Sequence, residues 1–354
     1  MASQSIIGFI GGGQLARMSA HAARALGHRC IFYSNDVDGP CAGLGEFCPG
    51  ADDDLAAYKS FAQKCSVVTL ENEYISSEIL FELEKITRVC PSASAFEKIE
   101  DKFKEKQFFA RCDIPVAPYA AVSSPELDMK AFAEKHSFPF MLKSVKGGYD
   151  GFGNYVVGDL PEAMRGFEAL GGNRGQAILM EAMQAFVAEV AVTVARNPEG
   201  EHVVYPVVDS VQSDAHICTR VIAPSSQPNS VTDLVIQYAV TAMDALAAVG
   251  VFSFEFFVLK DGAVVLNESA PRPHNSAHYT MDACETSQFT NHILAITGKA
   301  LGSTIMKCQS AEMENILGVA EAPRSTSENE FVHWYGKKES RPGRKMGHVN
   351  KLRF

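Results

Sequence analysis

The chain has 354 residues, more than one typical domain needs, which predicts two or three domains. Hydrophobic residues make up 46% and charged residues 21%, a globular composition that excludes collagen-like and disordered classes. The net charge of −10 disfavours nucleic acids and acidic membranes as partners. Nine cysteines without a Cys-x-x-Cys pair, a start without signal-peptide features and the lack of a membrane-span pattern predict a cytoplasmic protein.

The first 92 residues alternate apolar strands with helices. Residues 5–10, 30–33 and 66–70 have the pattern of buried strands, and residues 14–26 and 77–85 have helical spacing. This alternation predicts a parallel α/β sheet, Rossmann-like in organisation, as an N-terminal domain over residues 1–92.

The remaining chain is predicted to be of mixed α/β and α+β character. Helices are expected within 92–112, at 125–136 and at 231–249, and strands at 140–143, 154–157, 177–183, 187–196, 203–208, 217–222, 251–259 and 263–269. Asp261-Gly262 predicts a hairpin between the last two strands. The predicted domains are 93–183, 184–310 and a small C-terminal module at 311–354.

The glycine turn Gly11-Gly12-Gly13 follows a strand and precedes a helix, and with Ala16 it matches G-x-G-x-x-A. Such a turn can hold a phosphate at the helix N-terminus. Asp36 lies where a dinucleotide fold has its ribose-binding acid, so an NAD-dependent oxidoreductase is one interpretation. Close packing of strand against helix is the alternative role of the glycines.

A second glycine-rich segment, residues 147–153, follows Lys143 and contains Tyr149 and Asp150. Its backbone amides could wrap phosphate oxygens while Lys143 supplies a positive charge. The lysine precedes the glycines, so this is not a Walker A motif. A flexible hairpin is the alternative.

Two carboxylates, Glu255 and Glu268, each interrupt an apolar strand of the predicted hairpin. A hairpin of this length would set them side by side, with Asn267 next to Glu268. A divalent cation would relieve the repulsion, and oxygen ligands favour Mg²⁺. The alternative is that both side chains face solvent at a sheet edge.

The segment Pro271 to His278 follows directly and contains Arg272, His274 and His278. The prolines argue against a helix and hence against a zinc site, whereas Arg272 and the Arg344-Lys345 pair could hold an anionic substrate. A solvated basic loop is the alternative.

Taken in order, these motifs resemble the ATP-grasp superfamily and, within it, the N5-carboxyaminoimidazole ribonucleotide synthetase family of purine biosynthesis. The segments that carry the resemblance are 11–15, 71–73, Lys143, 147–151, 267–276, 286–289 and 343–348. The resemblance implies an ATP-grasp fold with an N-terminal Rossmann-like parallel-sheet domain and a small C-terminal module.

The resemblance also implies the roles of individual residues. The implied ATP-binding residues are Lys102, Lys143, Gly148, Tyr149, Asp150, Gly151, Phe152, Gly153, Asn154, Glu181, Ala182, Met183, Gln184, Glu189, Gln212, Asn267 and Glu268. The implied substrate-binding residues are Gly12, Gly13, Gln14, Leu15, Glu73, Tyr149, Asp150, Arg272, His274, Asn275, Ser276, Lys338, Arg344 and Lys345. The implied catalytic residues are Tyr149, Asp150, Arg272 and Lys345, and the implied Mg²⁺ ligands are Glu255 and Glu268.

The implied activity is ATP-dependent carboxylation of aminoimidazole ribonucleotide by bicarbonate through carboxyphosphate, in a homodimer with Mg²⁺ as cofactor. The chain departs from the family pattern at Phe152, where a basic residue is usual, and at Gln212 and Lys102, which replace His and Arg. Besides the oxidoreductase, a ligase for another small acceptor and a non-catalytic nucleotide-binding protein remain as alternatives.

Overall fold

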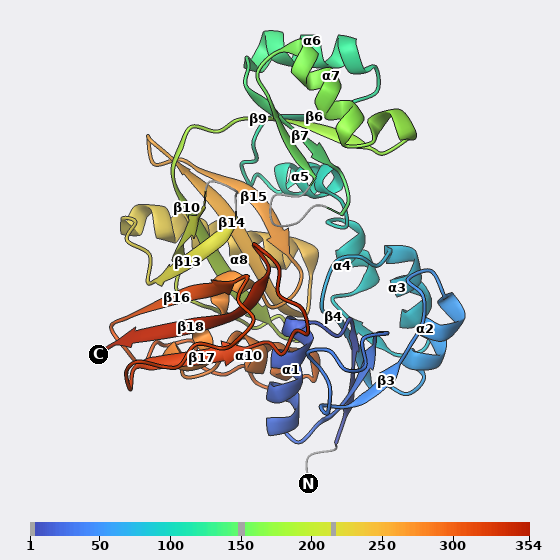
Figure 1. Ribbon diagram of the computed structural model, residues 1–354, viewed down its shortest axis with the longest axis vertical. Helices are drawn as coiled ribbons and strands as arrows, with labels where there is room; N and C mark the ends of the chain where they lie inside the picture. The colour runs from blue at the N-terminus through green and yellow to red at the C-terminus, as the bar shows by residue number, and fades with distance from the viewer. Residues whose placement is uncertain (1–3, 148–152, 214–216) are drawn as a thin grey trace.

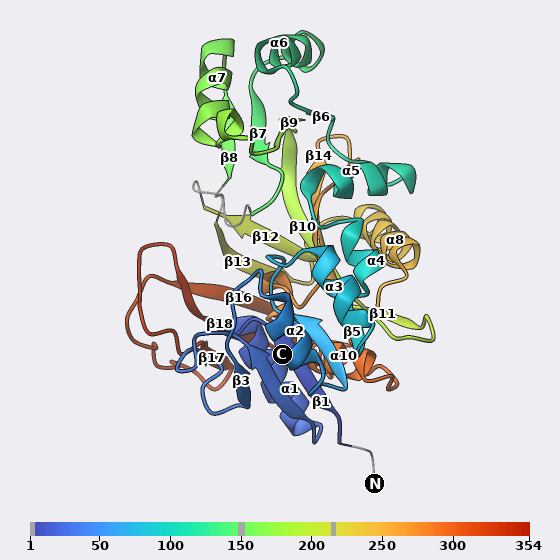
Figure 2. The same ribbon diagram turned by 90° about the vertical axis from the view of Figure 1, so that its right-hand side faces the viewer.

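The computed structural model describes residues 4–147, 153–213 and 217–354. These residues form three parts, an N-terminal parallel sheet, a small antiparallel sheet at the opposite end of the molecule, and a large sheet between and beside them (Figures 1 and 2). The described helices are all too short or too polar to span a lipid bilayer.

The N-terminal part is a five-stranded sheet of order β3-β2-β1-β4-β5, with every pairing parallel. Its predicted strands and helices are confirmed with ends shifted by a residue or so. Strands β3 and β5 and helix α2 are not among the predicted elements. The elements are β1 Ile6–Ile10, α1 Gln14–Ala25, β2 Arg29–Tyr33, β3 Glu46–Cys48, α2 Leu55–Ala62, β4 Val67–Leu70, α3 Ser77–Glu84, β5 Arg88–Cys90 and α4 Ala93–Glu97.

A helix from a distant part of the chain completes this N-terminal layer. Helix α10, Gln288–Ile296, buries Ile293 and Ile296 in one apolar cluster with Ile7 and Phe9 of β1. On the same helix, the His292 ring bonds the Thr69 hydroxyl of β4 at 2.9 Å. The N-terminal sheet is therefore fixed to the rest of the molecule by buried contacts.

The small antiparallel sheet has the order β6-β9-β7-β8 and carries helices α6 and α7 (Figure 1). Buried apolar residues of both helices, Met129, Phe132 and Ala163, join those of the strands in one core. The elements of this region are α5 Lys102–Arg111, β6 Tyr119–Ala121, α6 Pro125–His136, β7 Phe140–Ser144, β8 Asn154–Val157, α7 Leu160–Ala169, η1 Gly172–Arg174 and β9 Ile178–Ala182.

The large sheet has the order β15-β14-β10-β12-β13-β16-β18-β17, with β11 paired to β10, and helix α8 packs against β10 and β14. Its remaining elements are β10 Phe186–Arg196, β11 His202–Val204, β12 Val208–Gln212, β13 Cys218–Ala223, α8 Asn229–Leu246, β14 Gly250–Leu259, β15 Val264–Ala270, η2 Asn275–Ala277, α9 Thr280–Ala283, β16 Ser310–Leu317, β17 Glu330–Trp334 and β18 Lys345–Arg353.

Two predictions about this part need correction. The single strand predicted at 203–208 is two strands, β11 and β12, with Pro206 between them. Helix α8 ends at Leu246 instead of Val249, because Ala247 is left-handed with φ of 49°. The predicted C-terminal module, residues 311–354, continues the large sheet, since β16 pairs with β13 on one side and with β18 on the other.

Candidate active site

A cavity of about 370 Å³ lies where the three parts meet. Its wall comes from the start of α1, the segment after β4, helix α5, and strand β15 with the loop that follows. The predicted site residues that line it are Gln14, Leu15, Glu73, Lys102, Glu268, Arg272, His274, Asn275 and Lys345. Residues predicted from motifs far apart in the sequence therefore share one cavity.

A second cavity, of about 240 Å³, lies beside the first at the carboxyl ends of strands β1, β2 and β4. The two cavities share Glu71, Asn72 and Tyr74, and Gly12 lines the second one. The end of the parallel sheet thus contributes to both spaces, as expected for a doubly wound fold.

The glycine turn holds a side chain of the protein itself. The Glu71 carboxylate lies against Gly11 and Gly13. Burial raises the pKa of this group, against the opposing effects of Arg272 and of the Gly13 and Leu15 backbone amides. A Cβ at Gly11 would lie 2.6 Å from Glu71 Oε2, and one at Gly13 would also collide with this carboxylate. A carboxylate of the same chain therefore fills the space beside this turn at the N-terminus of α1, which disfavours the dinucleotide interpretation.

An arginine–carboxylate pair joins the N-terminal part to the loop after β15. Arg272 Nε lies 2.7 Å from Glu73 Oε1, and its Nη2 donates to Glu73 Oε2 at 3.1 Å. Burial acts to lower the pKa of Arg272, but the carboxylates of Glu73, Glu71 and Glu268 together outweigh this effect and the pKa is raised. This two-pronged contact fixes the plane of the guanidinium in the cavity wall.

A buried triad of charges lies where α5 meets the small sheet. Glu181 Oε1 on β9 accepts a hydrogen bond from Lys143 Nζ of β7 at 2.7 Å, and Glu181 Oε2 forms an ion pair with Lys106 Nζ of α5 at 2.6 Å. The exposed fractions of the three side chains are between 3% and 9%. Burial alone would raise the pKa of Glu181, but the two ammonium groups hold it at about 2. Burial lowers the pKa of Lys143.

Lys106 and Glu105 are not among the predicted site residues. Together with Lys102 they follow the i, i+3, i+4 spacing of one helix face, and this signal was available in the sequence. Lys102 Nζ bonds Glu268 Oε2 at 3.1 Å, which raises the pKa of Lys102 and, from the other side, holds that of Glu268 at about 2. Glu105 accepts the Ser269 backbone N–H at 2.7 Å and hydroxyl at 2.6 Å, and burial raises its pKa to about 7.

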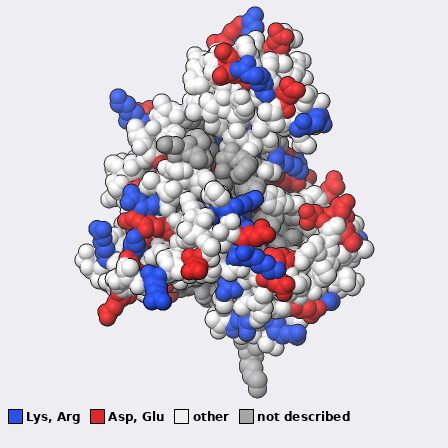
Figure 3. Space-filling model, viewed as in Figure 1, with Lys and Arg blue, Asp and Glu red and all other residues white. Residues whose placement is uncertain are grey.

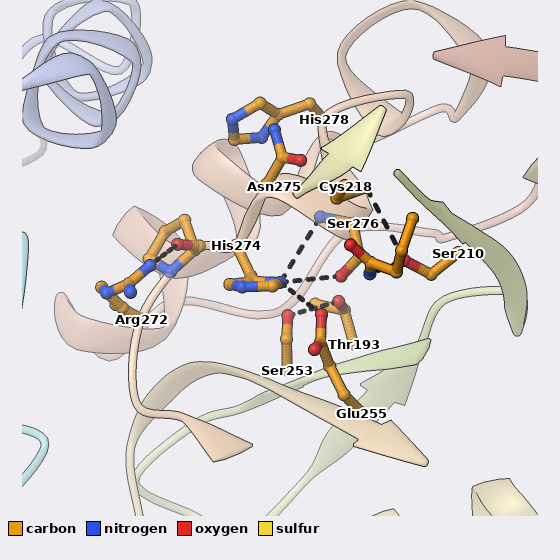
Figure 4. A network of polar contacts seen from close by, with 12 residues as sticks. Thr193, Ser210, Cys218, Ser253, Glu255, Arg272, His274, Asn275, Ser276 and His278 are labelled. Carbon is orange, nitrogen blue, oxygen red and sulfur yellow. Dashed lines mark hydrogen bonds and ion pairs between the residues drawn. The ribbon is translucent and has the colours of Figure 1, made fainter. Parts of the chain in front are cut away.

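Glu255 and Glu268 face each other across β14 and β15, as predicted. The pairing depends on a bulge at Asn267, because an uninterrupted ladder from Phe256–Leu266 would set Asn267 opposite Glu255. Figure 4 shows His274 pointing toward Glu255, with Nδ1 to Oε1 at 3.6 Å.

The paired carboxylates fit a Mg²⁺ site that substrate phosphates would complete. No group of three or more His, Cys, Asp or Glu side chains suited to a metal occurs in the described ranges. Mg²⁺ is usually held by one or two carboxylates plus substrate phosphates, and the neighbouring donors here, Glu255, Glu268 and Asn267, offer only the oxygen ligands it prefers.

Other predicted residues lie outside the cavity wall. Lys338 is near Asp38 and Asp36 at 3.4 and 3.7 Å, and Arg344 Nη1 donates to the Glu339 carbonyl. Gly13, Lys143, Gly153, Asn154, Glu181, Ala182, Met183, Gln184, Glu189, Gln212, Glu255, Asn267 and Ser276 also do not line the larger cavity. The predicted residues Gly148, Tyr149, Asp150, Gly151 and Phe152 lie outside the described residues.

Three domain families match the chain. Residues 4–100 match the ribonucleotide synthetase preATP-grasp domain, residues 107–289 the ATP-grasp domain, and residues 311–353 the phosphoribosylaminoimidazole carboxylase C-terminal domain. The predicted ATP-grasp fold is thereby confirmed.

Individual proteins match over nearly the whole chain. The N5-carboxyaminoimidazole ribonucleotide synthase of Mycobacterium tuberculosis is 36% identical, over 98% of this chain and 83% of its own length. The phosphoribosylaminoimidazole carboxylase of Ogataea methanolica is 35% identical, over 99% of this chain and 66% of its own. The chain spans only 63% to 66% of the length of this and two similar carboxylases.

A solved structure gives the same assignment. The N5-carboxyaminoimidazole synthase of Aspergillus clavatus, in complex with ADP and 5-aminoimidazole ribonucleotide, has a TM-score of 0.87 and 30% identity, over 99% of this chain and 94% of that one. The chain therefore belongs to the ATP-grasp family, in its N5-carboxyaminoimidazole ribonucleotide synthase branch.

Proposed function

We propose that the protein carboxylates 5-aminoimidazole ribonucleotide with bicarbonate at the expense of ATP, giving N5-carboxyaminoimidazole ribonucleotide, ADP and phosphate for purine biosynthesis. One observation carries the proposal. A single cavity is lined by Lys102 and Glu268, which suit a nucleoside triphosphate, and by Arg272 and Lys345, which suit an anionic second substrate. The relatives that carry this name support it.

Residues in and behind the cavity wall account for the first half of the reaction. Bicarbonate is a poor electrophile, so its oxygen attacks the γ-phosphorus of ATP, the bond to the ADP oxygen breaks, and carboxyphosphate forms. Lys102 and Lys143 place positive charge near the transferring phosphoryl group. Glu255 and Glu268 would hold Mg²⁺, which when bound supplies further charge neutralisation to the phosphates.

The second half transfers the activated carboxyl group. Carboxyphosphate releases CO₂ and phosphate, and the exocyclic amine of the ribonucleotide attacks the CO₂ carbon, loses a proton and becomes a carbamate. The Arg272 guanidinium, fixed by Glu73, orients the bound ribonucleotide. We assign Tyr149 and Asp150 to the amine, with Asp150 as the group that accepts its proton. Full turnover by an Asp150→Asn variant would refute that assignment.

ADP release by the purified protein tests the proposal. The protein is supplied with MgATP and bicarbonate, with and without aminoimidazole ribonucleotide, and the carbamate is trapped from ¹⁴C-bicarbonate. Strong stimulation by the ribonucleotide, with label in the product, is the expected result. ATP cleavage that ignores the ribonucleotide would indicate a different acceptor, and absence of ATP binding would exclude the ligase altogether.

We further propose that the protein acts as a cytoplasmic homodimer, which the family resemblance supports. Sedimentation equilibrium of the full chain at micromolar concentration tests the assembly. A mass near 38.4 kDa, that of one chain, would refute the dimer.

A further inference from the structure

Gln288 belongs to the segment 286–289, which helps to define the family resemblance but has no function in the reaction described so far. It is the first residue of α10 and its side chain has no exposed surface. We propose that Gln288 is a positioning residue, which fixes the substrate loop, residues 271–278, and the hydrogen position on His278. The inference rests on the proposed function, because that function assigns Arg272 to the ribonucleotide and the resemblance implies the same role for His274.

The Gln288 amide holds both backbone polar groups of His274. Its Oε1 accepts the His274 N–H at 2.8 Å, and its Nε2 donates to the His274 carbonyl at 2.8 Å. Because a backbone N–H can only donate, the first contact also establishes which end of the amide is oxygen. One side chain thus replaces the backbone pairing that a strand neighbour would give.

The loop needs such support because its sequence prevents regular pairing. Pro271 and Pro273 have no N–H, so neither can donate to a neighbouring strand. Farther along, Asn275 exchanges two amide hydrogen bonds with Asn315 of β16, at 2.9 and 2.8 Å. Gln288 therefore holds the part of the loop nearest Arg272, and Asn315 holds the part beyond it.

The same amide determines the tautomer of His278. Gln288 Nε2 has two hydrogens, one donated to the His274 carbonyl and the other to His278 Nδ1 at 2.9 Å. His278 Nδ1 is therefore an acceptor, and the hydrogen of the neutral ring is on Nε2. Burial, with His348 beside it, lowers the pKa of His278 well below its ordinary value and keeps the ring neutral. His278 lines the larger cavity, so the Gln288 amide fixes the tautomer of a ring in the cavity wall.

Helix α10 also provides a matched control. Asn291 is equally buried and makes the same number of side-chain bonds, to the Tyr205 hydroxyl at 2.8 Å and to the Gly302 carbonyl and N–H at 3.1 and 2.7 Å. None of these partners belongs to the substrate loop. Gln288→Met and Asn291→Leu therefore remove similar buried polar networks, of which only the first touches the loop.

Steady-state kinetics of the full-length variants separate positioning from general stability. We expect both variants to melt at lower temperature, but only Gln288→Met to raise KM for the ribonucleotide, by about tenfold, with KM for ATP unchanged. Gln288→Glu should not rescue binding, because its second oxygen would face two acceptors, the His274 carbonyl and His278 Nδ1. Equal changes in ribonucleotide KM for Gln288→Met and Asn291→Leu, or no change in either, would overturn the inference.

A second readout does not depend on activity. Imidazole ¹⁵N NMR of histidine-labelled protein, with the His278 signals assigned from a His278→Gln variant, reports which nitrogen carries the hydrogen. We expect a protonated Nε2 and an acceptor Nδ1 in the wild type, and loss of that preference in Gln288→Met. A hydrogen on Nδ1 in the wild type would refute the inference even if the enzyme is active. A wild type that lacks ribonucleotide-dependent ADP release refutes the proposed function alone, since the tautomer is still measured.

Discussion

Glu181, in the buried triad with Lys106 and Lys143, should contribute more to stability than either lysine. Glu181→Gln leaves two buried ammonium groups without a counter-charge, and removing one partner of a buried pair costs about 3–5 kcal/mol. Lys106→Met keeps the Lys143–Glu181 bond of 2.7 Å and deprives Glu181 Oε2 of its partner, which costs about 1–3 kcal/mol.

Urea unfolding at pH 7 gives the comparison, with Lys104→Met as the control. Lys104 lies on the same helix and pairs with Glu100 at 2.6 Å, but its side chain is 44% exposed, so its loss should cost less than about 1 kcal/mol. The reasoning fails if Lys106→Met destabilises the protein as much as Glu181→Gln does, or no more than Lys104→Met.

The pH dependence of the same variants provides an independent check. The pKa of Glu181 is about 2 in the folded protein and 4.5 ordinarily, so its ionisation stabilises the fold above pH 4.5 and this contribution is lost as the pH falls from 4.5 toward 2. The stability difference between wild type and Glu181→Gln should therefore shrink over that interval. A constant difference from pH 7 to pH 3 would contradict the ion-pair explanation.

Three further predictions concern the cavity wall. The pKa of Glu105 is raised to about 7 from an ordinary 4.5, so the folded protein loses stability as the pH rises from 4.5 to 7. Glu105→Gln, whose side chain still accepts the hydrogen bonds from Ser269, should therefore raise the melting temperature at pH 8 and not at pH 4.5. Equal shifts in melting temperature at the two pH values would disprove this. Glu268→Gln should lower kcat/KM with MgATP at least ~100-fold, and activity within tenfold of wild type would argue against a ligand role. Arg272→Lys keeps the charge but loses the two-pronged contact with Glu73, so KM for the ribonucleotide should rise about tenfold. An unchanged KM would show that this contact is not needed to bind the ribonucleotide.

The sequence predicted those features that depend on local pattern. The alternation of strands and helices in the first 92 residues predicted the parallel sheet, and the turn at Asp261-Gly262 predicted the hairpin that brings Glu255 and Glu268 together. The bulge at Asn267 could not be predicted, because it depends on how the two strands pair in three dimensions.

Features that depend on long-range packing were not predicted. Helix α10 completes the N-terminal layer from some 280 residues further along the chain, and no periodicity indicates such a partner. Lys106 and Glu105 could have been identified from their helical spacing with Lys102, but only the fold shows that this face meets Glu181 and Ser269.

Glu71 also affects which molecules can bind at the start of α1. An external phosphate that approached the amides of Gly13 and Leu15 would have to displace the Glu71 carboxylate. Because Glu71 belongs to the same chain, its carboxylate occupies this position without the entropy cost of association that a free ligand pays. The carboxylate acts as a permanent intramolecular competitor for that position. Glu71 therefore disfavours binding of a dinucleotide at this glycine turn, although the turn has the dinucleotide-binding pattern. The adjoining cavity suits a ligand that makes no contact with the N-terminus of α1.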